Sequence, residues 1–383
     1  MRVFLVAGEP SGDKLGAALM AGLKGLTDAE FSGVGGPLMQ AEGMESLFPM
    51  DELSVMGIAE VLPKYRHLRR RLHQTARAVL AARPDVLITI DSPDFCLRVA
   101  RLVKAQSAIR TVHYVAPSVW AWRAGRARKM ARHIDHVLAL LPFEPPYMQA
   151  EGMACDFVGH PVVAEPVPSA AEIAAFREGH GIGEGRILLV LPGSRRSEVS
   201  RLAPRFGEAL RPVLAAHPDL TLVTPTTAAA APVLREIVQH WPRQPLILSP
   251  EDTDSAAHAA EKRAAFYAAD YALAASGTVS LELAAADTPM VIAYDANWLT
   301  RRIVKALLKV DTATLVNLVS ETRAVPEFFG DACTPERIAE GVLGMMQDHA
   351  AQDDAMRLTM KRLGRGGEDP GLRAARAVLA GLR

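Results

Sequence analysis

Two adjacent arginines follow a short glycine turn near the middle of this 383-residue chain. Residues 187–191 are five consecutive apolar residues, typical of a buried parallel strand, and Gly193 and Ser194 then turn the chain before an amphipathic stretch. Backbone N–H groups at such a strand-to-helix turn form an anion site, to which Arg195 and Arg196 would add guanidinium groups suited to phosphate. The same pattern also fits an ordinary turn with two solvated arginines.

A second strand-to-helix turn, within residues 274–286, carries small and hydroxylated residues. Ser276, Gly277 and Thr278 follow an apolar run and precede a helical pattern, so their hydroxyls and amides are suited to bind phosphate. Glu282 lies one turn further along, where a carboxylate can accept both hydrogen bonds of a ribose diol. A solvated helix glutamate is the alternative interpretation of Glu282.

Acidic residues follow two predicted strands in the first part of the chain. Glu9 comes after the first of these strands and Asp91 directly after the second. Because the carboxyl ends of parallel strands meet at one edge of a sheet, we expect both carboxylates at that edge, together with Ser11 and Asp94. The alternative interpretation of Asp91 is an aspartate that holds its loop by accepting backbone N–H bonds, as aspartates in turns often do.

Short apolar runs alternate with longer amphipathic stretches, which is typical of α/β architecture with parallel sheets. The predicted strands are residues 3–7, 31–34, 86–90, 111–115, 137–141, 187–191, 220–223, 246–248, 271–275 and 290–294. The length exceeds a single core, and the proline-rich stretch 161–168 separates two sets of runs. We therefore expect two Rossmann-like domains whose parallel sheets face a cleft, residues 1–168 and 169–346. Residues 347–383 should pack back on the first domain through their last helix.

Charge and cysteine content restrict the class of protein. Lysine plus arginine equals aspartate plus glutamate at 43 each, so the composition gives no general attraction to nucleic acid. Residues 64–132 nevertheless hold sixteen basic and three acidic residues, which predicts a face that meets anions, unless these are solvated helix faces. The three cysteines are widely spaced, without metal-binding spacing. No apolar run is long enough to span a bilayer, so we expect a cytoplasmic protein with only peripheral membrane contact.

Two segments combine apolar and basic residues, as an interfacial anchor does. The second segment, residues 298–309, holds four basic residues among leucine and isoleucine. Either segment could instead be a core helix with solvated charges. The members of the first segment are Leu53, Val55, Met56, Ile58, Val61, Leu62, Lys64, Arg66, Arg69, Arg70 and Arg71.

Nine motifs, in order along the chain, resemble those of the lipid-A-disaccharide synthases. They are AGEPSGD at 7–13, GVGGPLMQAEG at 33–43, MGIAEVL at 56–62, IDSPDF at 90–95, HYVAPSVWAWR at 113–123, LPFE at 141–144, FVGHP at 157–161, LPGSRRSEV at 191–199 and ASGTVSLE at 275–282. The resemblance covers most of the chain and implies an inverting glycosyltransferase of the GT-B arrangement. The implied reaction joins UDP-2,3-diacylglucosamine to 2,3-diacylglucosamine 1-phosphate (lipid X), giving a β-1,6-linked disaccharide and UDP.

The resemblance also assigns roles to individual residues. It implies that Asp91 is the catalytic base, with Glu9 as the competing candidate. It places Asn317 near the donor, although this chain has Val316 where proline is expected. The residues implied to bind UDP are Gly193, Ser194, Arg195, Ser276, Gly277, Thr278, Glu282 and Asn317. Those implied to contact the acceptor, lipid or membrane are Ser11, Met56, Ile58, Val61, Leu62, Arg69, Arg70 and Arg71.

The resemblance implies that no cofactor and no metal are required, because helix dipoles and basic side chains neutralise the leaving diphosphate. The implied partners are the two lipid substrates and an anionic membrane surface, at the inner face of the inner membrane, and not nucleic acid. Two other functions fit parts of the sequence. A GT-B-like UDP-sugar epimerase would keep the UDP site without a lipid-facing patch, and a two-lobed binding protein without chemistry would not need Asp91.

Overall fold

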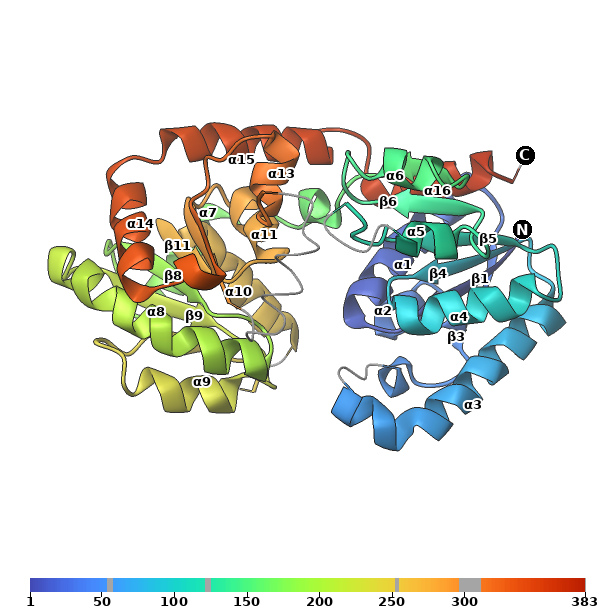
Figure 1. Cartoon of the computed structure of the whole chain (residues 1–383), viewed down its shortest axis with the longest axis horizontal. Coiled ribbons are helices and arrows are strands. Elements are labelled where there is room, and N and C mark those ends of the chain that lie inside the picture. Colours follow the sequence, from blue (N-terminus) through green and yellow to red (C-terminus); the bar gives the residue numbers. More distant parts are fainter. Residues whose placement is uncertain (54–57, 121–124, 252–254, 296–310, 383) are drawn as a thin grey trace. The chain divides into compact units, whose positions relative to one another are not determined.

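The computed structural model describes residues 1–53, 58–120, 125–251, 255–295 and 311–382, without the side chains of 58–64 and 255. The chain divides into two compact units (Figure 1). Unit 1 comprises Met1–Ala164 and Leu363–Arg383, and unit 2 comprises Glu165–Arg362. Each unit is an α/β fold built on a parallel sheet, which confirms the predicted fold class.

The described residues of unit 1 form a seven-stranded sheet with the order β3-β2-β1-β4-β5-β6-β7, and each neighbouring pair is parallel. The strands are β1 (Arg2–Ala7), β2 (Glu30–Val34), β3 (Glu45–Ser46), β4 (Val86–Ile90), β5 (Arg110–Tyr114), β6 (His136–Ala139) and β7 (Ala154–Phe157). The helices are α1 (Pro10–Leu26), α2 (Pro37–Ala41), η1 (Met50–Glu52), α3 (Ile58–Ala82), α4 (Pro93–Lys104), α5 (Gly125–Met130), α6 (Pro145–Gln149), η2 (Pro161–Ala164) and α16 (Pro370–Ala380).

Helices cover both faces of this sheet, which explains why β4 is apolar and buried throughout. On one face the C-terminal helix α16 packs against α1. Their backbones approach too closely for side chains, since a Cβ atom at Gly22 would lie 2.7 Å from the carbonyl oxygen of Gly371. On the other face α3 and α4 bury Val79 and Val99 against Phe4. The first and last helices of unit 1 are thus neighbours (Figure 1).

The described residues of unit 2 form a six-stranded parallel sheet with the order β10-β9-β8-β11-β12-β13. Its strands are β8 (Ile187–Leu191), β9 (Thr221–Pro225), β10 (Leu246–Leu248), β11 (Tyr271–Ala274), β12 (Met290–Tyr294) and β13 (Glu327–Phe329). Its helices are α7 (Ala170–Gly179), α8 (Arg196–Ala216), α9 (Ala231–Val238), α10 (Ser255–Ala268), α11 (Val279–Ala285), α13 (Leu315–Ser320), η3 (Gly330–Ala332), α14 (Pro335–Gln347) and α15 (Ala350–Leu363).

Strand order reverses once in each sheet. In unit 1 the reversal falls between β1 and β4, and in unit 2 it falls between β8 and β11. In open α/β sheets, ligands bind beyond the carboxyl ends of the strands at such a switch point, because the helices that follow the two strands lie on opposite faces and leave a crevice. The fold therefore marks one candidate site in each unit.

Helix α15 differs from the prediction that residues 347–383 pack on the first domain. Its side chains bond to the backbone of unit 2: Gln352 Oε1 accepts from Met290 N at 2.9 Å, and Thr359 Oγ1 donates to Val316 O at 3.2 Å. Gln352 and Thr359 are both buried. Residues 350–362 therefore belong to unit 2, and the chain returns to unit 1 only from Leu363.

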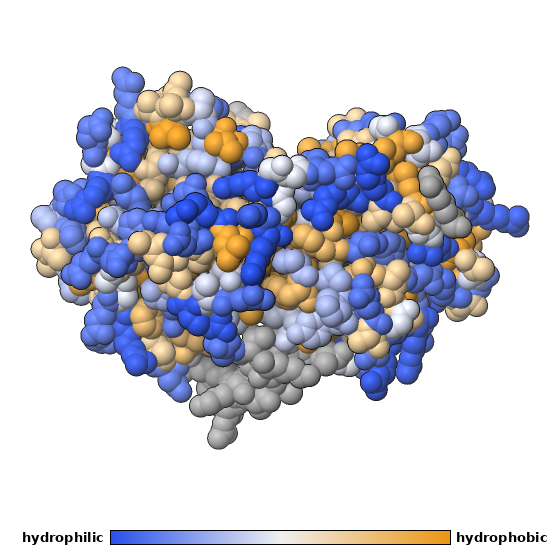
Figure 2. All heavy atoms as spheres, turned by 90° about the horizontal axis from the view of Figure 1, so that it is seen from above, coloured by the Kyte–Doolittle hydropathy of each residue, from blue (hydrophilic) through white to orange (hydrophobic). Residues whose placement is uncertain are grey.

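The face of the molecule drawn in Figure 2 mixes hydrophilic and hydrophobic residues. Within the described part of the chain, the large exposed hydrophobic residues are Leu38, Leu47, Tyr65, Tyr147 and Val167. They lie on different elements, as single exposed apolar residues do on most proteins. None of the described helices is both long and apolar enough to cross a membrane.

Candidate functional site

The switch point of unit 1 brings together three predicted site residues. Strands β1 and β4 pair in register at Ala7 and Ile90, so the loops that follow them leave the sheet side by side. A Cβ atom at Gly8 would lie only 2.8 Å from Ser92 Oγ, so the two loops touch. Across this contact, the Ser11 hydroxyl is close enough to the Asp91 carboxylate to favour its ionised form.

Asp91 has an unusual backbone conformation. It and Ser92 both have left-handed φ values, +49° and +41°, which L residues adopt at a cost of about 1–3 kcal/mol each. The Asp91 N–H donates to Tyr114 O on the neighbouring strand at 2.9 Å, which holds the turn in place. Such conformations concentrate at functional sites, where the surrounding fold maintains them.

The surroundings of Asp91 make its carboxylate a stronger base than an exposed aspartate. Burial raises the pKa of its carboxyl above the ordinary value, because a buried charge loses hydration, while the Ser92 N–H and the Ser11 hydroxyl oppose this shift. A general base works best when its pKa lies close to the working pH. Ser11 thus lowers the pKa of Asp91. The contact of Ser11 with the acceptor stays a prediction.

Glu9 occupies the N-cap position of α1 and is half-buried. Its charge and that of Asp91 both raise the pKa of the buried Cys96 thiol, after the larger effect of burial. Both carboxylates are therefore near the same buried atom, and Glu9 remains the alternative base. Asp94 is exposed in the first turn of α4, while Ser92 occupies the N-cap position.

Asp13, in the first turn of α1, has a structural role that the sequence did not indicate. Its buried carboxylate accepts hydrogen bonds from the N–H groups of Gly36, Leu38 and Met39 at 2.8–3.0 Å. These groups belong to the first turn of α2, whose free N–H donors a carboxylate satisfies. Asp13 therefore fixes α1 to the second glycine turn.

The first predicted UDP loop lies at the switch point of unit 2. Gly193 has φ +122°, and a Cβ atom there would lie 2.6 Å from Glu198 Cβ, so this turn requires glycine. Ser194 and Arg195 are exposed, and helix α8 begins at Arg196. The loop therefore has the predicted position between a strand and a helix N-terminus.

The prediction that the N–H groups of this loop are free is wrong for the structure as it stands. Glu198 Oε2 accepts from Ser194 N at 3.2 Å and from Arg195 N at 3.3 Å, and Glu198 Oε1 pairs with Arg195 Nη1 at 2.9 Å. A carboxylate at the third helical position commonly reaches back to satisfy these donors. Glu198 therefore occupies the place that a phosphate would take, and a bound diphosphate would have to displace it.

The second predicted UDP loop lies directly beside the first. Ala275 N donates to Leu191 O at 2.8 Å, so the chain segments leading into both loops are hydrogen-bonded neighbours. Ser276 is half-buried, while Gly277 and Thr278 are exposed ahead of α11. Two loops at one switch point can thus present N–H and hydroxyl donors to a single anion.

Glu282 on α11 is half-buried and already has a partner. Lys262 Nζ, on α10, donates to Glu282 Oε2 at 2.6 Å. Lys262 also lies over the ring of Phe266, at 5.1 Å from its centroid. No local sequence pattern indicates Lys262, which is twenty residues from Glu282. One oxygen of Glu282 remains for a ribose hydroxyl, and Lys262 orients the carboxylate.

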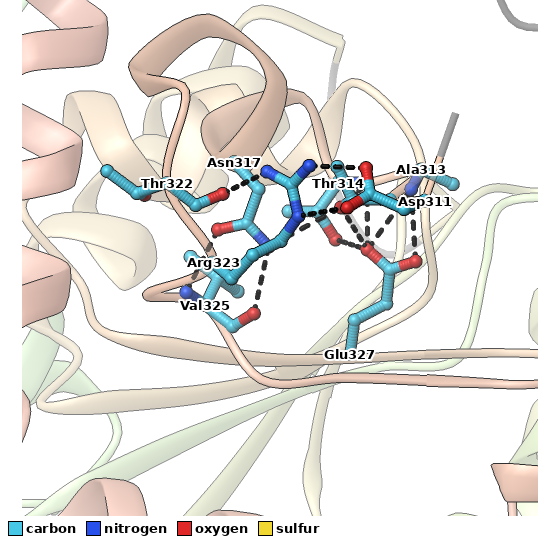
Figure 3. A network of polar contacts seen from close by, with 9 residues as sticks. Asp311, Ala313, Thr314, Asn317, Thr322, Arg323, Val325 and Glu327 are labelled. Carbon is cyan, nitrogen blue, oxygen red and sulfur yellow. Dashed lines mark hydrogen bonds and ion pairs between the residues drawn. The ribbon is translucent and has the colours of Figure 1, made fainter. Parts of the chain in front are cut away.

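The side chain of Asn317, which is predicted to lie near the donor, is hydrogen-bonded within the protein (Figure 3). It is buried, Asn317 Nδ2 donates to Val325 O at 2.9 Å, and Asn317 Oδ1 accepts from Val325 N at 3.0 Å. Glu327 completes the network by accepting from both hydroxyls of Thr312 and Thr314 and from the N–H groups that precede α13. The amide of Asn317 therefore joins α13 to the segment that leads into β13.

The structure describes only some of the residues predicted to contact lipid or membrane. Met56 lies outside the described residues, and so do the side chains of Ile58, Val61 and Leu62. Arg69 and Arg70 are exposed on α3, as a membrane contact requires.

Arg71 differs from the two arginines before it. Arg71 Nε and Nη2 donate to the two oxygens of Glu52 at 2.6 and 2.7 Å, and its guanidinium stacks on Phe48. This bidentate pair lowers the pKa of Glu52 to about 2, mainly through the hydrogen bonds from Arg71. Arg71 is thus paired within the protein, and its membrane contact stays a prediction.

Comparison with known proteins assigns this arrangement to one family. A family described as lipid-A-disaccharide synthetase matches residues 3–372. The lipid-A-disaccharide synthase of Ruegeria pomeroyi is 66% identical over 380 residues, covering 99% of this chain and 95% of that protein. The chain belongs to the lipid-A-disaccharide synthase family. The synthase of Rhodospirillum centenum is 47% identical over 384 residues, covering 98% of this chain and 94% of that protein. These matches confirm the resemblance that the nine motifs indicated.

Solved structures of low sequence identity share the fold. The UDP-GlcNAc 2-epimerase from Neisseria meningitidis, bound to UDP-GlcNAc, has a TM-score of 0.66 at 12% identity and covers 100% of this chain and 99% of its own. The epimerase from Methanocaldococcus jannaschii, in complex with UDP-GlcNAc and UDP, has a TM-score of 0.63 at 13% identity, with 99% of each chain covered. Likeness at this identity extends to the fold alone.

Glu144, in the LPFE motif that this chain shares with the synthase family, joins two loops of unit 1. Glu144 Oε2 accepts from Leu141 N at 3.0 Å, and Oε1 accepts from Trp120 Nε1 at 3.3 Å. Trp120 and Phe143 stack edge to face at 5.2 Å between ring centroids. Burial raises the pKa of Glu144 to about 7, although both N–H donors favour the ionised form.

The raised pKa of Glu144 predicts a pH dependence of stability. The protonated Glu144 carboxyl makes its full contribution to the free energy of unfolding below the ordinary pKa of 4.5. This contribution is lost as the pH rises through about 7, because the buried carboxyl must then ionise. The unfolding free energy of the wild type should therefore fall by about 3 kcal/mol relative to Glu144→Gln between these limits. Urea unfolding of both proteins from pH 4.5 to 8 measures this difference. Parallel pH curves would contradict the burial argument.

Proposed function

We propose that this chain joins UDP-2,3-diacylglucosamine to lipid X, forming the β-1,6-linked lipid A disaccharide 1-phosphate and UDP with inversion. The 66% identity to a named lipid-A-disaccharide synthase over nearly the whole chain is the observation that carries the proposal. The positions of the predicted loops at both switch points support it. Sharing a fold with UDP-GlcNAc 2-epimerases does not favour epimerisation, because identities of 12–13% are too low to transfer an activity.

The donor site in this proposal is the switch point of unit 2. The diphosphate of UDP would accept hydrogen bonds from the loops at 193–195 and 276–278, and the ribose would bond to Glu282. Arg195 would neutralise the charge that develops on the departing phosphate, in the way that fixed donors stabilise a leaving group. Glu198 would release the N–H groups of Ser194 and Arg195 as UDP binds. Among the described residues, no group of three or more metal-ligating side chains is present.

The base in this proposal is Asp91 of unit 1. Asp91 would take the proton from the primary hydroxyl of the acceptor as the oxygen attacks the anomeric carbon of the donor. The new carbon–oxygen bond forms as the bond to the UDP phosphate breaks on the opposite face, which inverts the anomeric configuration. The raised pKa of Asp91 suits proton transfer at neutral pH.

The test of the proposed function is the substrate requirement for UDP release. The purified chain should release UDP only when UDP-2,3-diacylglucosamine and lipid X are both present. UDP release without lipid X would indicate donor hydrolysis. Formation of a free epimerised sugar would favour the epimerase, and absence of any turnover would favour a binding protein.

We also propose that this reaction takes place at the inner face of the inner membrane, with the protein bound peripherally. Both substrates carry acyl chains, and the segment 53–62 supplies apolar residues ahead of a basic helix. Arg69 and Arg70 are exposed on that helix, while Arg71 forms an ion pair with Glu52. Apolar residues followed by exposed cations are typical of interfacial contact with anionic lipid.

The membrane proposal predicts salt-dependent binding to vesicles. The protein should sediment with phosphatidylglycerol vesicles at low salt and dissociate as salt rises, because each basic residue contributes about 1 kcal/mol that salt screens. Replacing both Arg69 and Arg70 with glutamate should abolish sedimentation. Arg77→Glu, exposed further along α3, is the matched control. Salt-insensitive sedimentation would instead assign the binding to apolar insertion.

A further inference from the structure

A pocket of about 270 Å³ lies in unit 1 between helices α4 and α5. Arg98 and Arg101 line it from α4, Arg126 and Lys129 line it from α5, and His133 also lines it. The two residues on each helix are three positions apart, so their side chains project from the same side of that helix. Two helices thus direct four cationic side chains to one hollow.

These four cations lack the neutralising partners that their neighbours have. Lys104 on α4 pairs with Asp135 at 2.5 Å, and Arg128 on α5 pairs with Glu151 at 3.2 Å. In the part of the chain that the structure describes, no ion pair or side-chain hydrogen bond satisfies Arg98, Arg101, Arg126 or Lys129. Grouping like charges without partners is unfavourable, and a bound anion would remove that repulsion.

The remaining lining consists of apolar residues, one acidic residue and one histidine. Leu97 and the buried Met130 form apolar lining, and Asp94 is the acidic residue of the pocket. Burial and the charge of Arg101 lower the pKa of His133, which leaves it a neutral hydrogen-bonding group at pH 7. A compact anion on a largely apolar carrier fits such a lining better than an extended polyanion does.

The pocket begins beside the proposed base. Pro93 and Asp94 line its end at the first turn of α4, and Asp91 precedes Pro93 by two residues. That end of α4 lies at the carboxyl edge of the sheet, at the unit 1 switch point. A ligand anchored in the pocket would therefore extend from the same edge that carries Asp91.

We propose that the α4–α5 pocket binds a phosphate group carried by a lipid. Two sources share this chemistry: the 1-phosphate of the lipid X acceptor and the head group of an anionic phospholipid. The acceptor source rests on the proposed function, and it would place the acceptor sugar between the pocket and Asp91. The head-group source requires only that the protein meets a membrane.

The variant that tests the proposal replaces Arg101 and Lys129, one cation from each helix, with glutamine. Both are exposed, so the fold should be retained, and thermal melting checks this. Arg128→Gln is the matched control, because it removes one charge from α5 outside the pocket. If the phosphate belongs to the acceptor, the double variant should raise the KM for lipid X about tenfold or more, with the KM for the donor unchanged.

A second substrate distinguishes the two sources. With 2,3-diacylglucosamine that lacks the phosphate, the wild type and the double variant should have the same KM, because the pocket then has nothing to bind. The other source predicts a different result. If the pocket binds a phospholipid head group, the KM values for both acceptors should be equal in both proteins, and the double variant should no longer sediment with phosphatidylglycerol vesicles. If the double variant matches Arg128→Gln in both assays, the proposal is overturned.

A readout without turnover separates this proposal from the proposed function. Binding of glucosamine 1-phosphate, followed by titration calorimetry, should weaken about tenfold or more in the double variant and should be absent with glucosamine. If the wild type binds glucosamine 1-phosphate or the vesicles through the pocket but never releases UDP, the proposed function fails while the pocket stands. If neither probe depends on the pocket cations, the pocket proposal fails whatever the activity is.

Discussion

Asp91→Asn is expected to lower kcat by about 100-fold or more while leaving the fold and UDP binding intact. Asparagine keeps the size of the side chain and can still accept the Ser11 and Ser92 hydrogen bonds, but it cannot take the acceptor proton. Initial rates with both lipid substrates measure the loss. Titration of UDP and thermal melting show whether binding and folding are retained.

Two further variants make this result specific. Glu9→Gln should reduce kcat far less, and the base role passes to Glu9 if that variant loses turnover while Asp91→Asn keeps it. Ser11→Ala removes a hydrogen bond that lowers the pKa of Asp91, so this pKa should rise further. The acidic limb of the kcat/KM profile should then move to higher pH. An unmoved limb would mean that Asp91 does not titrate in that range.

Arg195→Ala is expected to lower kcat/KM by about 2–4 kcal/mol, with both a higher donor KM and a lower kcat. The guanidinium is exposed at the start of α8, where it can meet the diphosphate, and its attraction should increase as the phosphate gains charge. Steady-state kinetics with varied donor measure both constants.

Arg196→Ala is the matched control for Arg195, because it is the adjacent exposed arginine, at the first position of α8. Its effect should be several-fold smaller. Equal losses in both variants would indicate a general electrostatic effect, and normal turnover of Arg195→Ala would mean that the anion site is misplaced.

Glu198→Gln should tighten UDP binding, since a carboxylate no longer competes with the diphosphate.

The strands and the loops that follow them were predictable because parallel strands are buried on both faces. Residues 86–90, 187–191, 246–248 and 290–294 are observed as β4, β8, β10 and β12 with the predicted ends, and the other predicted strands are present with ends moved by one or two residues. Strands β3, β7 and β13 were missed. They are short strands at or near sheet edges, which carry little apolar pattern.

Side-chain partners were much less predictable than backbone elements. Glu52 and Arg71 are nineteen residues apart in sequence, and Lys262 and Glu282 are twenty apart, so nothing in the local pattern indicates either pair. Glu198 lies three residues after Arg195, a capping spacing that is visible in the sequence but does not reveal which N–H groups the carboxylate accepts from. Asn317 has the residue type of a nucleotide contact, but only the packing of α13 reveals that its amide is used internally.

The most direct test of the donor site is a crystal structure of the chain with UDP bound. We predict the diphosphate between the loops at 193–195 and 276–278, the ribose on Glu282, and the Glu198 carboxylate turned away from Ser194 and Arg195. Asn317 should keep its bonds to Val325 without touching UDP. Density for UDP away from both loops, with Glu198 still bonded to Ser194 N, would contradict the account.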